Sequence, residues 1–216
     1  MALRYEHLRE RSLDRIAGLS DGVFAFAMTL IVFEIRVPDP APIGSEEQLW
    51  SALSALAPRF VTYLLSLLTL GIAWNAQQTH LRYVASADRV FTWISLAFLA
   101  IITLIPFSTS LLAEFITFRL ALAIYWLNIF LFGAAFFWGA TYARSAHLLS
   151  EDAPAQLTNV LRRRAIVAQS LYALGALLAF GSTYLSIAFI VFAQLYYALA
   201  LGPRIPLLRR TVIGRS

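Results

Sequence analysis

The sequence predicts an all-α membrane protein with six transmembrane helices. Of its 216 residues, 60% are hydrophobic and only 13% are charged, whereas a soluble domain has about 25% charged residues. Because so few charged residues cannot cover a water-facing surface, most of the chain is expected to face lipid. The apolar residues also occur in long runs, and six of these runs reach the roughly 20 residues that a helix needs to cross a bilayer.

The first two predicted helices are bounded by prolines and polar residues. The first covers about residues 14–37 and ends at a series of prolines that begins with Pro38. The second covers about residues 47–83, which is longer than a bilayer requires. We therefore expect it to tilt or to project into water, with a bend at Pro58.

The other four predicted helices are separated by short connections. They cover about residues 88–113, 117–145, 160–181 and 184–202. The last two are joined by only "GSTY", so they must form an antiparallel hairpin. The longest connection is interpreted as a turn, so residues 1–216 are predicted to form a single transmembrane domain without a soluble module.

The distribution of arginine predicts the orientation. All 17 basic residues are arginines, and cytoplasmic loops carry the excess of basic residues. The N-terminal segment, the second-to-third connection, the fourth-to-fifth connection and the C-terminal tail hold four, two, four and four of them, whereas "DPAPIGSEEQ" and "GSTY" hold none. We therefore expect a multi-pass protein of the cell membrane with both termini in the cytoplasm.

Composition also excludes several kinds of site. The chain has no cysteine, which excludes disulfides, thiolate metal sites and cysteine nucleophiles. Its three histidines form no recognisable metal triad, and no cofactor is expected. The net charge of +5 comes from arginines in the connections, so we do not expect a nucleic acid partner.

The first helix carries an apolar stripe. At 100° per residue from Asp21, Phe26 falls near about 140°, Leu30 near about 180° and Phe33 near about 120°. These three side chains therefore share a face that points away from Asp21. On another part of the helix, Gly18 and the small residues after it allow close approach of a second helix.

The polar step at the start of this helix has two interpretations. An ionisable side chain inside a membrane costs a few kcal/mol, so Arg15, Ser20 and Asp21 either lie at the cytoplasmic interface or belong to a buried hydrogen-bonded network. The polar end of the second helix, "WNAQQTH", lies at the same depth. It offers four candidate partners for Asp21 and Ser20: Trp74, Asn75, Gln78 and His80.

These motifs resemble a known family. "RIAGLSD" is similar to the R-x3-F-S-D signature on the first helix of the transmembrane-protein-175 potassium channels, with Leu19 in the phenylalanine position. "EIRVP", "WNAQQTH" and "IPFSTSLL" extend the resemblance along the chain. It implies a bacterial single-repeat member, a homotetramer whose first helices line a potassium-permeable pore. The expected partners are copies of the chain itself, potassium ions and membrane lipids.

The resemblance also implies a role for individual residues. Phe26 takes the position of the pore constriction, with Leu30 and Phe33 as further layers, and Thr29 takes a position implicated in selectivity. Potassium would pass these side chains transiently, without a fixed metal site, through a hydrophobic gate. The sequence has no T-V-G-Y-G run for a carbonyl filter. The implied signature network consists of Arg15, Ser20, Asp21, Trp74, Asn75 and His80.

Three other functions are compatible with parts of the sequence. A proton- or cation-coupled secondary transporter could use Asp21 and His80 as a relay, but such proteins usually contain repeated broken helices, and Pro106 has no counterpart in the second half. An intramembrane enzyme would have to use Ser20, Asp21 and His80, a poor nucleophile–base set, so no enzyme is expected. A membrane protein with only a structural role stays open.

Overall fold

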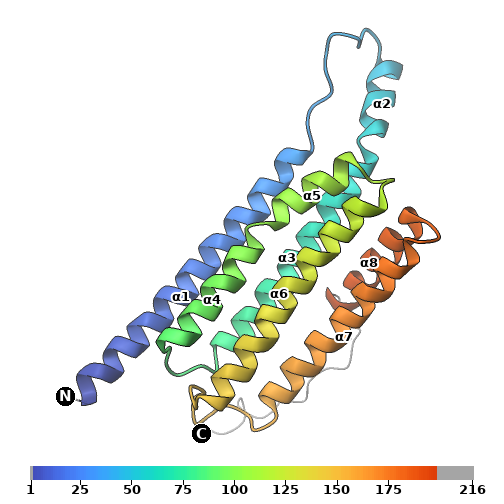
Figure 1. Ribbon diagram of the computed structural model, residues 1–216. Helices are drawn as coiled ribbons and strands as arrows, with labels where there is room; N and C mark the ends of the chain where they lie inside the picture. Colours follow the sequence, from blue (N-terminus) through green and yellow to red (C-terminus); the bar gives the residue numbers. More distant parts are fainter. Residues whose placement is uncertain (1, 199–216) are drawn as a thin grey trace, which may run out of the picture.

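The fold is an elongated bundle of helices (Figure 1). The computed structural model describes the backbone of residues 2–198 and the side chains of residues 12–196. Within these residues the elements are α1 (Ala2–Leu30), the 3-10 helix η1 (Ile31–Glu34), α2 (Glu46–Ala55), α3 (Ala57–Leu81), α4 (Arg89–Ile102), α5 (Ile105–Glu114), α6 (Arg119–Ser145), α7 (Leu157–Leu178) and α8 (Thr183–Ala198). The described part contains no β-strand, only one bridge between Val84 and Leu149. The predicted end of the sixth helix, at residue 202, lies outside the described residues.

Four segments of the described chain are long and apolar enough to cross a membrane. They are Ser12–Glu34, Ala57–Leu81, Arg89–Glu114 and Arg119–Ser145. The first four predicted spans therefore correspond to these segments. By the same measure α8 offers only a shorter apolar stretch, Thr183–Tyr196, and the first two turns of α7 hold the run of arginines at residues 162–164.

Prolines divide two of the predicted helices. α2 and α3 meet at Leu56, and α4 and α5 meet at residues 103–104. Pro58 and Pro106 each lie in the first turn of the helix that follows, where proline needs no hydrogen-bonded N–H and its fixed φ suits the helix. The predicted helices over 47–83 and 88–113 are thus each two helices, and α2 projects beyond the bundle (Figure 1).

The core holds α1 against the neighbouring helices. Phe24, Ala27 and Ile31 are almost completely buried and belong to a cluster with side chains of α3, α4, α5, α6 and α7. In lipid, such packing stabilises the bundle through close van der Waals contact, because the surrounding hydrocarbon is as apolar as the helices. α7 and α8 meet where Gly175 lies so close to Ile190 that an added Cβ would be 2.5 Å from that side chain.

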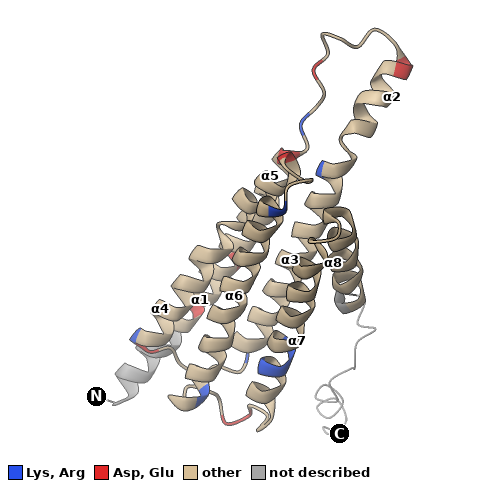
Figure 2. Cartoon of the chain, turned by 45° about the vertical axis from the view of Figure 1, so that its right-hand side comes forward, with Lys and Arg blue, Asp and Glu red and all other residues tan. Residues whose placement is uncertain are grey.

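The arginine-rich end is closed by two connections that pair with each other. The N–H of Ala85 donates to the carbonyl of Leu148 at 2.8 Å, and the N–H of Ser150 donates to the carbonyl of Tyr83 at 2.9 Å. Asp88 caps α4 by accepting from the N–H of Phe91 at 2.7 Å. Figure 2 shows that most charged residues of the described region lie toward the two ends of the bundle.

Candidate pore-lining surface

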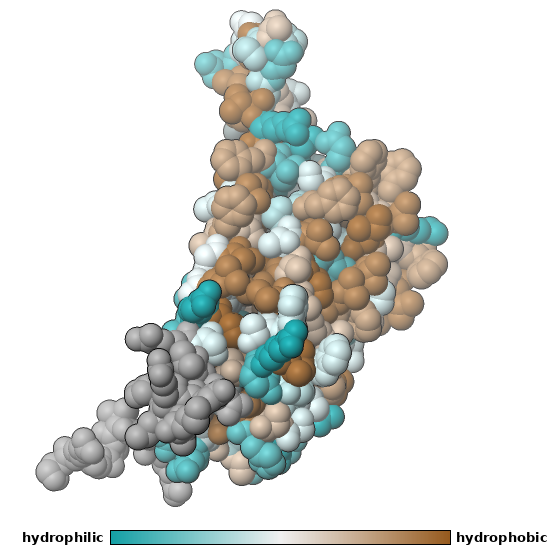
Figure 3. Space-filling view, turned by 60° about the vertical axis from the view of Figure 1, so that its left-hand side comes forward, coloured by the Kyte–Doolittle hydropathy of each residue, from teal (hydrophilic) through white to brown (hydrophobic). Residues whose placement is uncertain are grey.

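α1 has one buried face and one exposed face. The buried residues of α1 and of η1, which continues it, recur at helical spacing, at positions 16, 20, 24, 27 and 31, and pack into the bundle. On the other side, the side chain of Phe26 is 64% exposed and that of Phe33 is 72% exposed. The subunit therefore presents large aromatic side chains outward, toward lipid or toward another chain. The surface seen in Figure 3 is largely apolar between its polar ends.

The predicted gate residues lie on this exposed side. Phe26 and Thr29 are exposed, Leu30 is half-buried, and Phe33 lies in η1, where the helix tightens. The Thr29 hydroxyl donates to the carbonyl of Phe26 at 2.8 Å. This bond uses its proton, so the lone pairs of the Thr29 oxygen stay available to a cation or to water. Phe26, Thr29 and Phe33 therefore share an exposed surface of the chain, with Leu30 at its edge.

Asp21 is hydrogen-bonded to the neighbouring helix α3. Its Oδ1 atom accepts from Nε1 of Trp74 at 2.8 Å and from Nε2 of Gln78. Both donors lie on one face of α3, four residues apart. Hydrogen bonds to an ionised acceptor are stronger than neutral ones, so these two contacts fasten the start of the apolar stripe to its own subunit.

Two other predicted members of the network lie elsewhere in the core. Ser20 is completely buried, and its Oγ atom has no hydrogen-bond partner among the described residues. His80 is 3% exposed and lies between the rings of Phe91 and Phe136, at centroid distances of 5.9 and 5.7 Å. His80 therefore contacts aromatic rings and does not bond to Asp21.

Asn75 and Arg15 also lie outside the hydrogen bonds of Asp21. Asn75 is exposed and lines a cavity beside α7. Arg15 is exposed and makes no hydrogen bond or ion pair with a described side chain. The six residues implied by the resemblance thus do not form a single network within one chain. Among them only Trp74 bonds to Asp21, and the second donor is Gln78, a candidate partner outside that set.

The opposite end of the stripe has a second anchor, which the sequence analysis missed. Ser110 donates to the Glu34 carboxylate at 2.7 Å, and Nη1 of Arg59 donates to the Glu34 carbonyl at 3.3 Å. Arg59 also pairs with Glu114 at 2.5 Å. Glu34 and Glu114 each stand near the outer end of a predicted helix, but Arg59 lies twelve residues inside the predicted helix over 47–83. Only the division of that helix before Pro58 brings Arg59 to the same end.

A chain of hydroxyl groups crosses the interior of the bundle. The Ser66 and Thr109 oxygens are 2.6 Å apart, and the Tyr125 hydroxyl lies 3.2 Å from Ser66 and 3.1 Å from Thr69. Nε2 of Gln194 donates to Thr69 at 2.6 Å. These bonds join α3, α5, α6 and α8, because a buried polar group in an apolar setting needs a partner. They hold the scaffold behind the exposed stripe.

The described residues contain no group of three or more His, Cys, Asp or Glu side chains that could hold a metal ion.

A family model described as the endosomal/lysosomal potassium channel TMEM175 matches residues 15–106. A potassium channel of Streptomyces collinus is 33% identical over 190 residues, which span 85% of this chain and 90% of the relative. The chain belongs to the TMEM175 family.

Further comparisons support the TMEM175 assignment. A potassium channel of Chamaesiphon minutus is 32% identical over 191 residues, 86% of this chain and 93% of the relative. The crystal structure of a lysosomal potassium-selective channel TMEM175 homolog from Chamaesiphon minutus matches with a TM-score of 0.77 and 26% identity, covering 90% of this chain and all of that one. The resemblance drawn from the signature is thereby confirmed, and the TMEM175 relatives are ion channels and not enzymes.

Proposed function

We propose that this chain is one subunit of a potassium-permeable channel, in which four copies surround a pore lined by α1. The relatives that match over most of their length are named as potassium channels, and the matching structure is described as potassium-selective. The observation that carries the proposal is the outward stripe on α1, with Phe26 and Phe33 more than 60% exposed while Asp21 and Glu34 fasten both ends of the stripe to the subunit.

The proposed topology has six spans and both termini in the cytoplasm. α7 has 22 residues, or about 33 Å of helix, which is slightly more than the roughly 30 Å thickness of the hydrocarbon core. α8 continues the hairpin with the apolar stretch Thr183–Tyr196. The arginine distribution supports this orientation, since the arginines of the connections next to α3, α4, α6 and α7 then share one side. The cell membrane is the proposed location.

The proposed gate is a ring of apolar side chains. Potassium must lose water to pass a narrow ring formed by copies of Phe26, and removing a charge from water is costly. A hydrophobic constriction therefore closes by expelling water and opens when the rings move apart. Leu30 and Phe33 extend this dry section, and the outward oxygen of Thr29 supplies the polar contact that favours one cation over another.

Reconstitution tests the proposal directly. Purified protein in liposomes with a potassium gradient should show conductive flux. A planar bilayer with potassium on one side and an equal concentration of sodium on the other should give a reversal potential whose sign shows that potassium permeates more readily than sodium. Conductive flux runs down the ion's own gradient and needs no second ion. A flux that saturates at a low rate and requires a proton gradient would instead identify a coupled transporter and contradict the channel proposal.

A further inference from the structure

A cavity of about 370 Å³ lies between α3 and α7, away from the exposed stripe of α1. It is partly open, and most of its lining is apolar. α6 contributes Phe132, Gly133 and Phe136, and α8 contributes Ile190 and Gln194. This volume is within the range of natural ligand pockets, about 300–1,000 Å³. The interior of a close-packed bundle holds few such spaces, so the cavity calls for an occupant.

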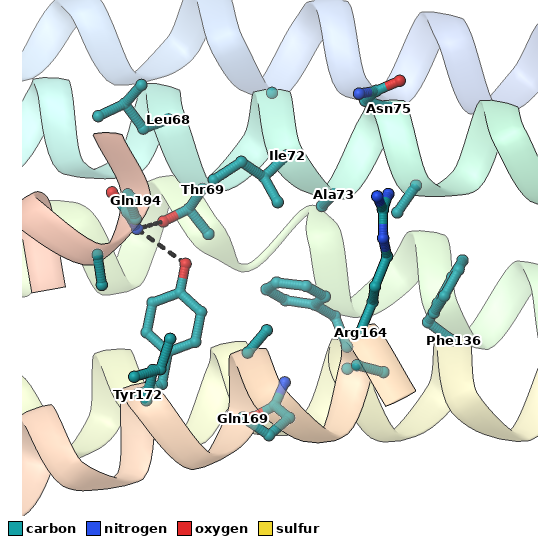
Figure 4. A pocket seen from close by; sticks show the side chains of 18 of the residues that line it. Leu68, Thr69, Ile72, Ala73, Asn75, Phe136, Arg164, Gln169, Tyr172 and Gln194 are labelled. Atoms are coloured by element: carbon teal, nitrogen blue, oxygen red, sulfur yellow. Dashed lines mark hydrogen bonds between the residues drawn. The ribbon is translucent and has the colours of Figure 1, made fainter. Parts of the chain in front are cut away.

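One cation stands at the arginine-rich end of this cavity. Arg164 extends from α7 toward α3, and its guanidinium group lies on the side of Asn75 (Figure 4). It forms no hydrogen bond or ion pair with a described side chain, and neither Glu151 nor Asp152 reaches it. Arg162, by contrast, lies over the ring of Phe137 at 4.8 Å. Among the described residues, Arg164 is therefore an unpaired charge at the mouth of an apolar space.

The deep end of the cavity is closed by polar groups that bond to one another, and the Oε1 atom of Gln194 is buried there without a partner among the described residues. Nε2 of Gln194 donates to Thr69 at 2.6 Å and to the Tyr172 hydroxyl at 2.9 Å (Figure 4). Arg164 and Tyr172 are eight residues apart on α7, which places them about 12 Å apart along the helix. The space between Arg164 and this end suits a hydrocarbon chain whose anionic head group lies at Arg164.

We propose that this cavity binds an anionic phospholipid from the leaflet on the arginine-rich side, with the phosphate at Arg164 and an acyl chain along the apolar walls. Basic pockets between transmembrane helices characteristically take anionic head groups, and arginine pairs with phosphate through two parallel hydrogen bonds. The open side of the cavity leaves the rest of the lipid in the bilayer. A second copy of the chain carries a net charge of +5, so it is less suited than an anionic lipid to pair with Arg164.

Native mass spectrometry of the purified full-length protein tests the charge. Phosphatidylglycerol and phosphatidylcholine with the same acyl chains are titrated onto wild type, Arg164→Gln and Arg163→Gln. Arg163 is exposed on the same turn of α7 and does not line the cavity, so its variant removes an equal charge. Arg164→Gln should bind phosphatidylglycerol about tenfold more weakly, with phosphatidylcholine unchanged. Equal losses in both variants would show general surface attraction and overturn the proposal.

A thiol placed in the cavity tests the location and does not depend on the arginine variants. The chain has no natural cysteine, so Ala168→Cys inside the cavity and Ile166→Cys, which is 55% exposed on the same helix, each give one reactive site. Phosphatidylglycerol vesicles, compared with phosphatidylcholine vesicles, should slow the labelling of Ala168→Cys only. Equal labelling in both lipids, or cross-linking of Ala168→Cys between two copies, would reject the lipid as occupant.

Discussion

Asp21 and Phe26 stand five residues apart on α1 and have different surroundings. The Asp21 carboxylate is held by Trp74 and Gln78 of α3, whereas Phe26 extends away from the subunit. The difference arises because each residue of a helix is rotated by about 100° from the one before, so side chains five residues apart point in different directions. Residue-scale predictions therefore separate the anchor from the gate.

Replacing Phe26 with asparagine should hydrate the proposed gate. A polar amide in the ring lowers the barrier to water entry, so potassium leak through reconstituted protein should rise about tenfold, which corresponds to about 1.4 kcal/mol. The preference for potassium over sodium should fall at the same time. Flux assays and reversal potentials measure both effects. Phe107→Asn is the control, since Phe107 is 63% exposed on α5; equal effects in both variants would remove Phe26 from the gate.

Replacing Asp21 with alanine should weaken the subunit more than it changes ion preference. The change leaves the N–H groups of Trp74 and Gln78 without their acceptor, and we expect a loss of about 1 kcal/mol in stability. Thermal unfolding and the yield of assembled protein measure this loss. Asp14→Ala on the exposed side of the same helix is the control. An assembled, stable Asp21→Ala protein with altered ion preference would contradict the anchoring role.

His147 occupies a backbone position that favours glycine. Its φ is 54°, and it ends α6 in the pattern where Leu148 N–H donates to Ala143 and His147 N–H donates to Arg144. A side chain in this left-handed region costs about 1–2 kcal/mol. His147→Gly should therefore raise the melting temperature of the protein, whereas Ala146→Gly, at φ −89°, should lower it slightly. The reverse order would contradict this account of the cap.

At the scale of elements, the outer anchor connects η1, α3 and α5. Arg59 bonds to the Glu34 carbonyl and pairs with Glu114, while Ser110 holds the Glu34 carboxylate. Exposed ion pairs contribute little to global stability, about 0–1 kcal/mol, and the Glu114 side chain is 57% exposed. The effect of this anchor should thus be local, at the end of the exposed stripe.

Replacing Arg59 with glutamine should loosen η1 without melting the bundle. Hydrogen exchange of residues 31–36 should become faster, because the carbonyl and carboxylate of Glu34 lose or weaken their connection to α3. The free energy of unfolding should fall by no more than about 1 kcal/mol, so the melting temperature should change little. Arg36→Gln, which removes an exposed charge from the same region, should leave the exchange unchanged. Faster exchange across α3 as well would indicate general unfolding.

Apolar run length predicted the four segments that are long enough to span a membrane, but not the divisions between α2 and α3 and between α4 and α5. The direction in which side chains face explains a further error at His80. Trp74 and Gln78 are four residues apart and share a face of α3, whereas His80 is six residues from Trp74 and points elsewhere. Helical spacing alone could thus have separated His80 from Asp21. The bonds among Ser66, Thr69 and Tyr125 had no such signal, because isolated hydroxyl residues in apolar runs do not reveal their partners before the helices are packed.

At the scale of the whole molecule, the proposed pore requires several copies of the chain. One subunit cannot enclose a pore with one lining helix, and a closed ring of identical subunits places the same surface of each around the axis. The scaffold behind the stripe is complete within the subunit: the cores around α1 and around Tyr125 are each filled by side chains of this chain. Assembly is therefore expected to join subunits that are already folded.

Cysteine substitution tests which surface meets the axis. The natural chain has no cysteine, so Phe26→Cys should form disulfides between copies under mild oxidation, and native mass spectrometry should show four subunits. Phe192→Cys is the matched control, since Phe192 is 69% exposed on α8. Cross-linking through Phe192 and not through Phe26 would place α8 at the centre and end the proposed arrangement.

The two fastenings of α1, at Asp21 and at Glu34, restrict how the proposed channel can open. They are thirteen residues apart, or about 20 Å along the helix, and the exposed stripe lies between them. Because both ends of the stripe are bonded to the rest of the same chain, the stripe should move together with its whole subunit. Opening the proposed pore would then require whole subunits to tilt outward together. A stimulus that opens it is therefore expected to act at the interfaces between subunits.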